Sequence, residues 1–146
     1  MRGSPLFFEK GNEKMAYQIQ KKRHINKKLD LLGNDGKVEK TLKVDIVVDD
    51  FRNRYPVVMA NVRKAQEMLD TSGENDAEAI VASQIAVKAV FVLVFGEVQT
   101  REFLKYYENR YAEAFLDVIP FITEEIMPEV NKAVNEENMR IQSVMK

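Results

Sequence analysis

The sequence predicts an α+β protein that is mainly α-helical: an N-terminal β-hairpin followed by about four helices, the last one kinked at prolines. Three observations predict this class. Apolar and polar residues alternate from Ile25 to Val48, which is typical of strands with one buried face. From Asp49 onwards, apolar residues recur at helical spacing. The final apolar stripe continues through Pro120, in a segment that also contains Pro128.

The hairpin is predicted from two runs of alternating residues around a turn. Ile25, Leu29 and Leu31 share one parity, and "GNDG" (Gly33–Gly36) is a turn signal because Asn, Asp and Gly tolerate positive φ. The second run places one set of side chains on a single face: Val38, Leu42, Val44, Ile46 and Val48. Since two strands alone are marginally stable, helices or another subunit must cover that face.

The first helix is expected after Asp49 and Asp50, which we predict to end the strand and supply the N-cap. Its apolar side is Phe51, Tyr55, Val58, Val62, Ala65 and Leu69. Pro56 opens the alternative that the helix begins there, with 51–55 as a separate turn. Gly73 in "TSGEND" is expected to be the C-terminal cap.

A second helix is expected from Asn75 or Asp76, with its faces traced by Ile80, Val81, Ile85, Lys88 and Val92. The stretch "AVKAVFVLVFG" that ends at Gly96 could be a buried strand. We favour a buried helix end, because the preceding residues are good helix formers and Gly96 closes the segment. A third helix is expected at roughly 98–109, with Phe103, Leu104 and Tyr107 facing inward.

The segment "YYENRYAEAFLDVIPFITEEIMPEV" (Tyr106–Val130) is predicted to be one bent helix, or short helices restarted at Pro120 and Pro128. The bend would wrap the core of the protein or present a curved edge to the next subunit. The last residues, "NKAVNEENMRIQSVMK", predict a weaker helix that frays.

Residues 15–146 are expected to form a single domain, with a β-hairpin region at 15–48 and a helical region at 49–146. Residues 1–14 resemble a leader or vector-derived segment: "MRGS" is common in expression vectors, and "EKGNEK" suits a translated ribosome-binding site before Met15. The alternative is a natural N-terminus. The mass of protein made from the native gene decides between them.

Composition excludes several classes of protein. The chain has 146 residues, a net charge of −1 and no cysteine, which excludes disulfides, thiolate catalysis and cysteine-based zinc sites. The apolar run Ala89–Phe95 is far too short to span a bilayer, and no signal-peptide pattern opens the chain, so we expect a cytoplasmic protein without a membrane partner.

Charge is uneven along the chain. Residues 17–43 hold eight Lys/Arg and three Asp/Glu, a balance of +5, whereas residues 96–138 hold four Lys/Arg and ten Asp/Glu, a balance of −6. This polarity could guide head-to-tail contact between subunits. It could equally reflect two solvated faces that never meet.

No catalytic, metal or cofactor site is predicted, and we expect a non-enzymatic protein. His24 is the only histidine and lies in the polar run "KKRHINKK". The acidic pairs, such as Glu124–Glu125, are adjacent residues that point about 100° apart on a helix and so do not form a metal pincer. The basic stretch Gln20–Lys28 is the best nucleic-acid candidate, but it lacks interleaved aromatics. We expect an ordinary flank there.

Late aromatics form a cluster at helical spacing. Core packing is the first explanation and an oligomer interface the second, because Tyr suits half-wet contact surfaces. The residues predicted to contact a partner or another copy, if the second explanation holds, are Tyr106, Tyr107, Tyr111, Phe115, Ile122, Ile126 and Met127.

The stretch "FGEVQTREFLKYYENRYAEAFLDVIPFITEEIMPEV" (Phe95–Val130), with a strand pair followed by helices, resembles the tail assembly chaperones of long-tailed (siphovirus-type) bacteriophages. The resemblance covers roughly Asp49–Val130 and is clearest in the Phe-Gly-Glu, Tyr-Tyr-Glu-Asn and Ile-Pro-Phe-Ile pieces. It carries no catalytic signature and no fixed functional residues.

The resemblance implies a protein that binds the tape measure protein, helps recruit subunits of the major tail protein, and self-associates. It implies the cytoplasm of the bacterial host and absence from the mature virion. It also implies a short form beside a frameshift-extended form. The alternatives are a virion structural or adaptor protein, such as a head–tail connector or tail component, and a small nucleic-acid-binding regulator using Gln20–Lys28.

Overall fold

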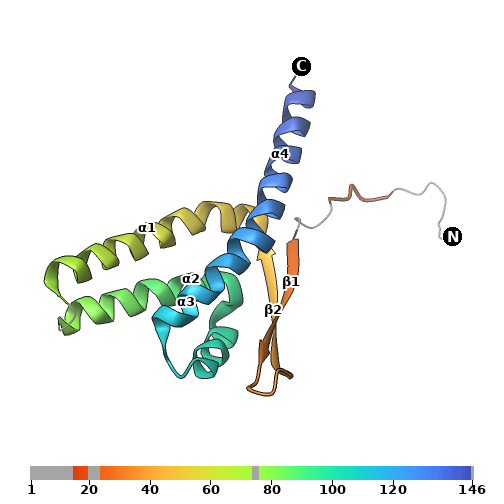
Figure 1. Cartoon of the computed structure of the whole chain (residues 1–146). Helices are drawn as coiled ribbons and strands as arrows, with labels where there is room; N and C mark the ends of the chain where they lie inside the picture. Colours follow the sequence, from red (N-terminus) through yellow and green to blue (C-terminus); the bar gives the residue numbers. More distant parts are fainter. Residues whose placement is uncertain (1–14, 20–23, 74–75, 146) are drawn as a thin grey trace.

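The computed structural model describes residues 15–19, 24–73 and 76–145 (Figure 1). The leader segment predicted at 1–14 lies outside these residues. Two strands, β1 (His24–Leu32) and β2 (Val38–Val47), are followed by the helices α1 (Val48–Ser72), α2 (Ala77–Tyr106) and α3 (Tyr111–Phe121). A π-helical turn, Ile122–Ile126, joins α3 to α4 (Met127–Val144). The predicted class, a hairpin followed by helices with the last one joined from pieces, is confirmed.

The two strands form the predicted antiparallel hairpin, with Ile25 opposite Ile46 and Leu29 opposite Leu42. Gly36 has a φ of 78° in the turn, which is why glycine suits that position. One face is buried, as the alternation predicted: Ile25, Leu31, Leu42, Val44, Ile46 and Val48 are all at most 5% exposed. Val38 departs from the pattern at 54% exposed, because the register slips between Leu31 and Leu32 opposite it.

Helix α1 follows β2 without a connecting loop, so the N-cap predicted at Asp49 and Asp50 is wrong. The cap residue is Val47, without a side-chain cap, and both acids lie in the first turn, where the helix dipole favours negative charge. The alternative start at Pro56 is also wrong, because Pro56 lies inside α1. Phe51 is buried and stacks on Tyr55 at 5.1 Å, a contact that needs helix before the proline.

Helix α2 begins as predicted and breaks where predicted. The Asp76 carboxylate accepts hydrogen bonds from the N–H groups of Glu78 (3.0 Å) and Ala79 (3.2 Å), and Gly73 caps α1 by donating to the Leu69 carbonyl. The segment before Gly96 is helix and not strand, and Gly96 interrupts α2 with φ 81° and ψ 169°. The continuation ends at Tyr106, three residues before the predicted end.

The two late prolines lie in one continuous bent helix. Pro120 is in the last turn of α3 and Pro128 in the first turn of α4, with the π turn between them. The N–H of Met127 bonds to the carbonyl of Ile122, five residues back. The wider turn keeps one line of side chains inward: Ala114, Val118, Ile122, Ile126, Val130 and Ala133, each at most 2% exposed. The inner side of the bend therefore covers the protein's own core.

One buried cluster joins the hairpin face to the helices. Its aromatic centre packs at ring distances of about 5 Å: Phe91, Phe95, Phe103 and Tyr107. The inward positions predicted for Phe103, Leu104 and Tyr107 are confirmed. The apolar face of the hairpin is thus covered within the chain, and α1 and α2 lie side by side as a long helical hairpin (Figure 1).

Within the described residues, α2 has the length and composition to cross a membrane, because its apolar window of 18 residues has a mean hydropathy of 2.1. A core helix of a globular protein meets the same criterion, and α2 supplies Val90, Phe91 and Val94 to the core. Only 39% of the apolar window is buried within the chain. Helix α2 therefore leaves apolar surface that its own fold does not use.

Candidate functional site

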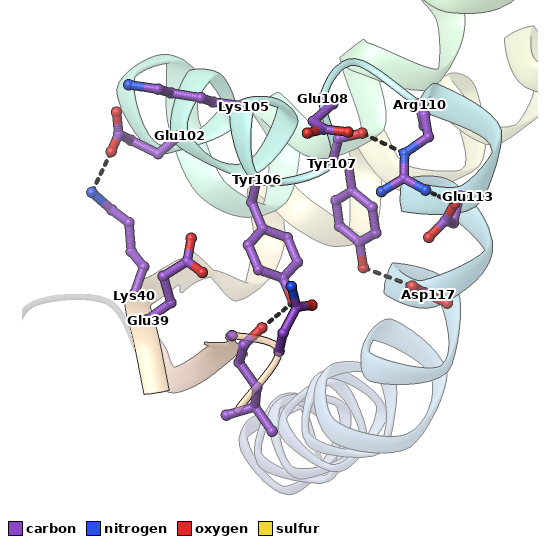
Figure 2. Close-up of a pocket in the computed structure, with 13 residues that line it drawn as sticks. Glu39, Lys40, Glu102, Lys105, Tyr106, Tyr107, Glu108, Arg110, Glu113 and Asp117 are labelled. Carbon is purple, nitrogen blue, oxygen red and sulfur yellow. Dashed lines mark hydrogen bonds and ion pairs between the residues drawn. The ribbon is translucent and has the colours of Figure 1, made fainter. Parts of the chain in front are cut away.

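A recess lies where the turn of the β-hairpin meets the junction between α2 and α3 (Figure 2). Its volume is about 730 Å³. The lining is mostly polar: Leu32, Gly33, Asn34, Glu39, Lys40, Glu102, Lys105, Tyr106, Tyr107, Glu108, Arg110, Glu113 and Asp117. We call this set the junction recess.

Two tyrosines predicted as partner contacts meet in this recess. The Tyr106 hydroxyl donates to the carbonyl of Leu32 (2.6 Å), which ties α2 to the end of β1. The Tyr107 hydroxyl donates to Asp117 Oδ2 (2.7 Å), which ties α2 to α3. The pKa of Tyr107 is raised well above its usual range, mainly by burial and secondly by the hydrogen bond to Asp117. Tyr107 therefore stays neutral and serves as a donor.

The turn between α2 and α3 is held in an unusual backbone shape. Glu108 and Asn109 have φ values of 54° and 61°, in the left-handed region that a glutamate rarely adopts. Arg110 fixes the turn: its Nε donates to the carbonyl of Tyr107 (2.9 Å), and a terminal nitrogen donates to Glu113 (2.8 Å). Arg110 thus links the end of α2 to the first turn of α3.

Ion pairs join the basic and acidic parts of the sequence within one chain. Lys40 on β2 pairs with Glu102 on α2, and this pair lowers the pKa of Glu102. Lys27 on β1 pairs with Glu129 and lies 3.7 Å from Glu125, and the hydrogen bond to Glu129 raises the pKa of Lys27. The interpretation that the basic and acidic faces never meet is therefore wrong, because these ion pairs join the two regions within one chain.

The lining of the junction recess contains no Ser, Thr or His, so it offers no Ser–His pair of nucleophile and base. Its ionisable side chains are carboxylates, lysines, one arginine and tyrosines. His24 lies on β1, with its Nδ1 2.6 Å from Asp45 Oδ1. In the part of the chain that the structure describes, no three His, Cys, Asp or Glu residues are grouped to hold a metal ion. The recess suits recognition of polar groups.

Comparison of the chain with protein-family models, curated proteins and solved structures finds no match.

The seven predicted contact residues fall into two groups. Ile122 and Ile126 are fully buried and Tyr107 is 8% exposed, so the chain's own core uses these three side chains. Tyr106, Tyr111, Phe115 and Met127 are half-buried at the margin of the core. The π turn holds Ile122 and Ile126 on the inner line, which places these two side chains in the core.

The structure adds an apolar surface that the sequence reasoning did not assign. On the helical hairpin, α1 exposes Val57 and Met68, and α2 exposes Ile80, Val81 and Ile85. On α4, the exposed apolar residues are Met139, Ile141 and Val144. The sequence contains a signal for the exposed residues of the helical hairpin, because the residues of α2 are apolar on more sides of the helix than one contact with the core requires.

The basic stretch predicted as the nucleic-acid candidate is partly engaged. Its residues 20–23 lie outside the described residues. Within the described part, Lys27 is paired with acids and His24 contacts Asp45, whereas Lys28 is exposed. The described part therefore offers less free positive charge than its sequence suggested.

Proposed function

We propose that this protein is a non-enzymatic phage tail assembly chaperone, which binds the tape measure protein and helps recruit tail-tube subunits. The observation that supports this proposal is a set of exposed apolar side chains on long helices, outside the core. The resemblance of Phe95–Val130 to the chaperone family supplies the identity of the partners. The same resemblance supplies the expected place, the cytoplasm of the bacterial host, and the expected absence from the finished virion.

The helical hairpin is the first surface that supports this proposal. Val81 is 51% and Ile85 65% exposed on α2, and Val57 is 59% exposed on α1. Exposed apolar residues scattered singly are ordinary, but Val81 and Ile85 are one helical turn apart and form a row. A long apolar partner can lie across such a row without a deep pocket.

The outer half of α4 is the second surface. From Asn135 to Met145 every residue is exposed, and Figure 1 shows this end of the helix extending beyond the other elements. Met139 is 69% and Ile141 59% exposed. Methionine adapts its shape to varied partners, so this helix suits a client chain of varied sequence.

Co-expression with a tape measure protein tests the proposal. The parent chain should keep that protein soluble and should co-purify with it. A variant with Val81→Ser and Ile85→Ser should lose this effect while its circular dichroism stays unchanged, because both side chains lie outside the core. Gln84→Ser, an exposed polar change on the same helix, is the matched control and should behave like the parent. Unchanged solubility of the client with the parent chain refutes the proposal.

Two further measurements separate the alternative functions. Mass spectrometry of purified virions should find no copy of this chain, and its stable presence there favours the structural or adaptor protein. A gel shift at low salt should find no nucleic-acid complex. A shift that is lost when Lys28 becomes Glu would favour the regulator.

A further inference from the structure

The two outer edges of the β-hairpin differ. On β2, the side chain of Gln99 from α2 imitates a neighbouring strand: its Oε1 accepts from the N–H of Lys43 (2.7 Å), and its Nε2 donates to the Lys43 carbonyl (2.6 Å). The main chain of Lys43 therefore points away from β1. Helix α2 occupies this edge, so the edge has no room for another strand there.

The strand register shows which main-chain groups of β1 point away from β2. Lys43 lies opposite Lys28, and in an antiparallel pair the residues that bond across the ladder alternate with residues whose N–H and C=O groups point outward. Asn26, Lys28 and Asp30 therefore present their main-chain groups to the outside. All three residues are exposed.

The outward groups of β1 are open in the described structure. No hydrogen bond to another described residue reaches the main-chain N–H or C=O of Asn26, Lys28 or Asp30 at this edge. Tyr106 takes only the carbonyl of Leu32, where the edge ends. An unpaired strand edge of this kind is a template for an added strand.

A groove lies beside the same part of β1. Its volume is about 250 Å³, and its lining is mainly apolar, with Leu29 and Leu31 from β1, Phe103 and Tyr106 from α2 and Val118 from α3. In an added strand, alternate side chains would point to the core side of the sheet. One of them would lie over this groove.

The described segment 15–19 has the sequence of such a strand. Met15, Tyr17 and Ile19 occupy alternate positions and are 67%, 91% and 86% exposed, so no described part of the chain covers them. The segment carries no charged side chain and meets no like charge at Lys28. We call residues 15–19 the arm.

We propose that the arm of one copy of this protein adds as a strand to the outer edge of β1 in a second copy. Met15, Tyr17 and Ile19 then lie on the core side, with one of these side chains in the groove. Each copy offers one arm and one edge, so two copies can exchange arms in a closed dimer, and further copies can extend a head-to-tail chain or ring. The inference gives a structural basis to the self-association that the resemblance implies. Its failure leaves the proposal of client binding untouched, because co-expression with the tape measure protein tests client binding separately.

Light scattering during size-exclusion chromatography tests whether the arm drives association. The molar mass of the parent should rise with concentration, whereas the variant Tyr17→Ser with Ile19→Ser should remain a monomer. Met139→Ser with Ile141→Ser removes two exposed apolar groups from α4, 69% and 59% exposed, and should associate like the parent. A monomeric parent at every concentration, or association that survives in the arm variant, overturns the proposal.

A proline scan tests which edge is used. Lys28→Pro removes an outward N–H, so the hairpin should keep its stability while association is lost, since proline is tolerated where the N–H faces outward. Lys27→Pro removes a ladder bond to β2 together with the ion pair to Glu129, and should instead lower the melting temperature. If Lys28→Pro folds and still associates, the arm does not bind this edge.

Cross-linking distinguishes exchange between copies from closure within one chain. The protein has no cysteine, so Gln18→Cys with Asn26→Cys supplies the only thiols. A short bifunctional thiol reagent should give a ladder of dimers and larger species, beyond what either single variant gives. A cross-link confined to monomers would show that the arm closes on its own sheet, and it would refute exchange.

Discussion

Replacing Ile122 by Ala tests whether the line of residues at the π turn serves the core or a partner. Ile122 is fully buried, and the change removes three carbons from the core. At about 0.8 kcal/mol per carbon the transfer term is about 2.4 kcal/mol, and the remaining cavity raises the loss to about 3 to 4 kcal/mol. With a urea slope of about 2 kcal/mol per M, the midpoint falls by about 1.5 to 2 M.

Urea unfolding followed by circular dichroism measures this loss. Leu116→Ala is the matched control, because Leu116 lies on α3 at 69% exposed and its truncation should change the free energy of unfolding by less than about 0.5 kcal/mol. The reasoning is refuted if Ile122→Ala unfolds like the parent. A variant that unfolds like the parent but loses self-association or client binding would place Ile122 at an interface.

Three further changes test local features of the fold. Thr100→Val should raise the free energy of unfolding by about 1 kcal/mol, because the buried Thr100 hydroxyl has no hydrogen-bond partner among the described residues; a calorimetric melting temperature at or below the parent's contradicts this. Gly96→Ala should lower that free energy by about 1 to 2 kcal/mol, because φ is 81°; a more stable variant in the same assay would show that the break is not required. Lys40 lowers the pKa of Glu102, so the stability from this pair is present above the ordinary pKa of a glutamate and is lost as the pH falls through the lowered value. Melting temperatures of Glu102→Gln should therefore fall less steeply in acid than those of the parent, and parallel curves would exclude the pair as a contributor.

The chaperone and arm-exchange proposals concern different surfaces. Client binding is proposed for apolar residues such as Val81 and Met139, whereas self-association is proposed for the arm and the open edge of β1. Variants of one surface should leave the other intact. A strand-exchanged chain of copies would repeat the helical surfaces along its length, so that weak contacts with a long client would reinforce each other.

The sequence by itself determined the elements whose signals are local. Strict alternation placed one face of the hairpin inward, and the burial of Leu42, Val44 and Ile46 confirms it. The sequence predicts a helix start near Asn75 or Asp76 and a segment that Gly96 closes. In the structure the cap is Asp76 and the break is at Gly96, where a capping carboxylate and a missing Cβ act locally. These assignments succeeded because each depends on neighbours in the sequence.

Only the tertiary structure decided the features that depend on distant contacts. Packing of Phe51 against Tyr55 extended α1 ahead of Pro56, against the local preference for a start at the proline. Ile122 and Ile126 are both buried because a π turn keeps them on the same side of the helix. The periodicity of the sequence does not predict a π turn. The candidate contact residues could therefore be predicted as a cluster, but not divided into core and margin.

The outer edges of the hairpin show most clearly the difference between what the sequence predicts and what the tertiary structure decides. The alternation of residues in β1 and β2 predicts which side chains are buried, but it treats the outer edges of the two strands alike. Gln99 distinguishes them, because it is 56 residues from Lys43 in sequence and reaches its main chain only through the packing of α2 on β2. Sequence periodicity reports the faces of a sheet, whereas the occupation of its edges is set by whichever distant element the fold brings beside them.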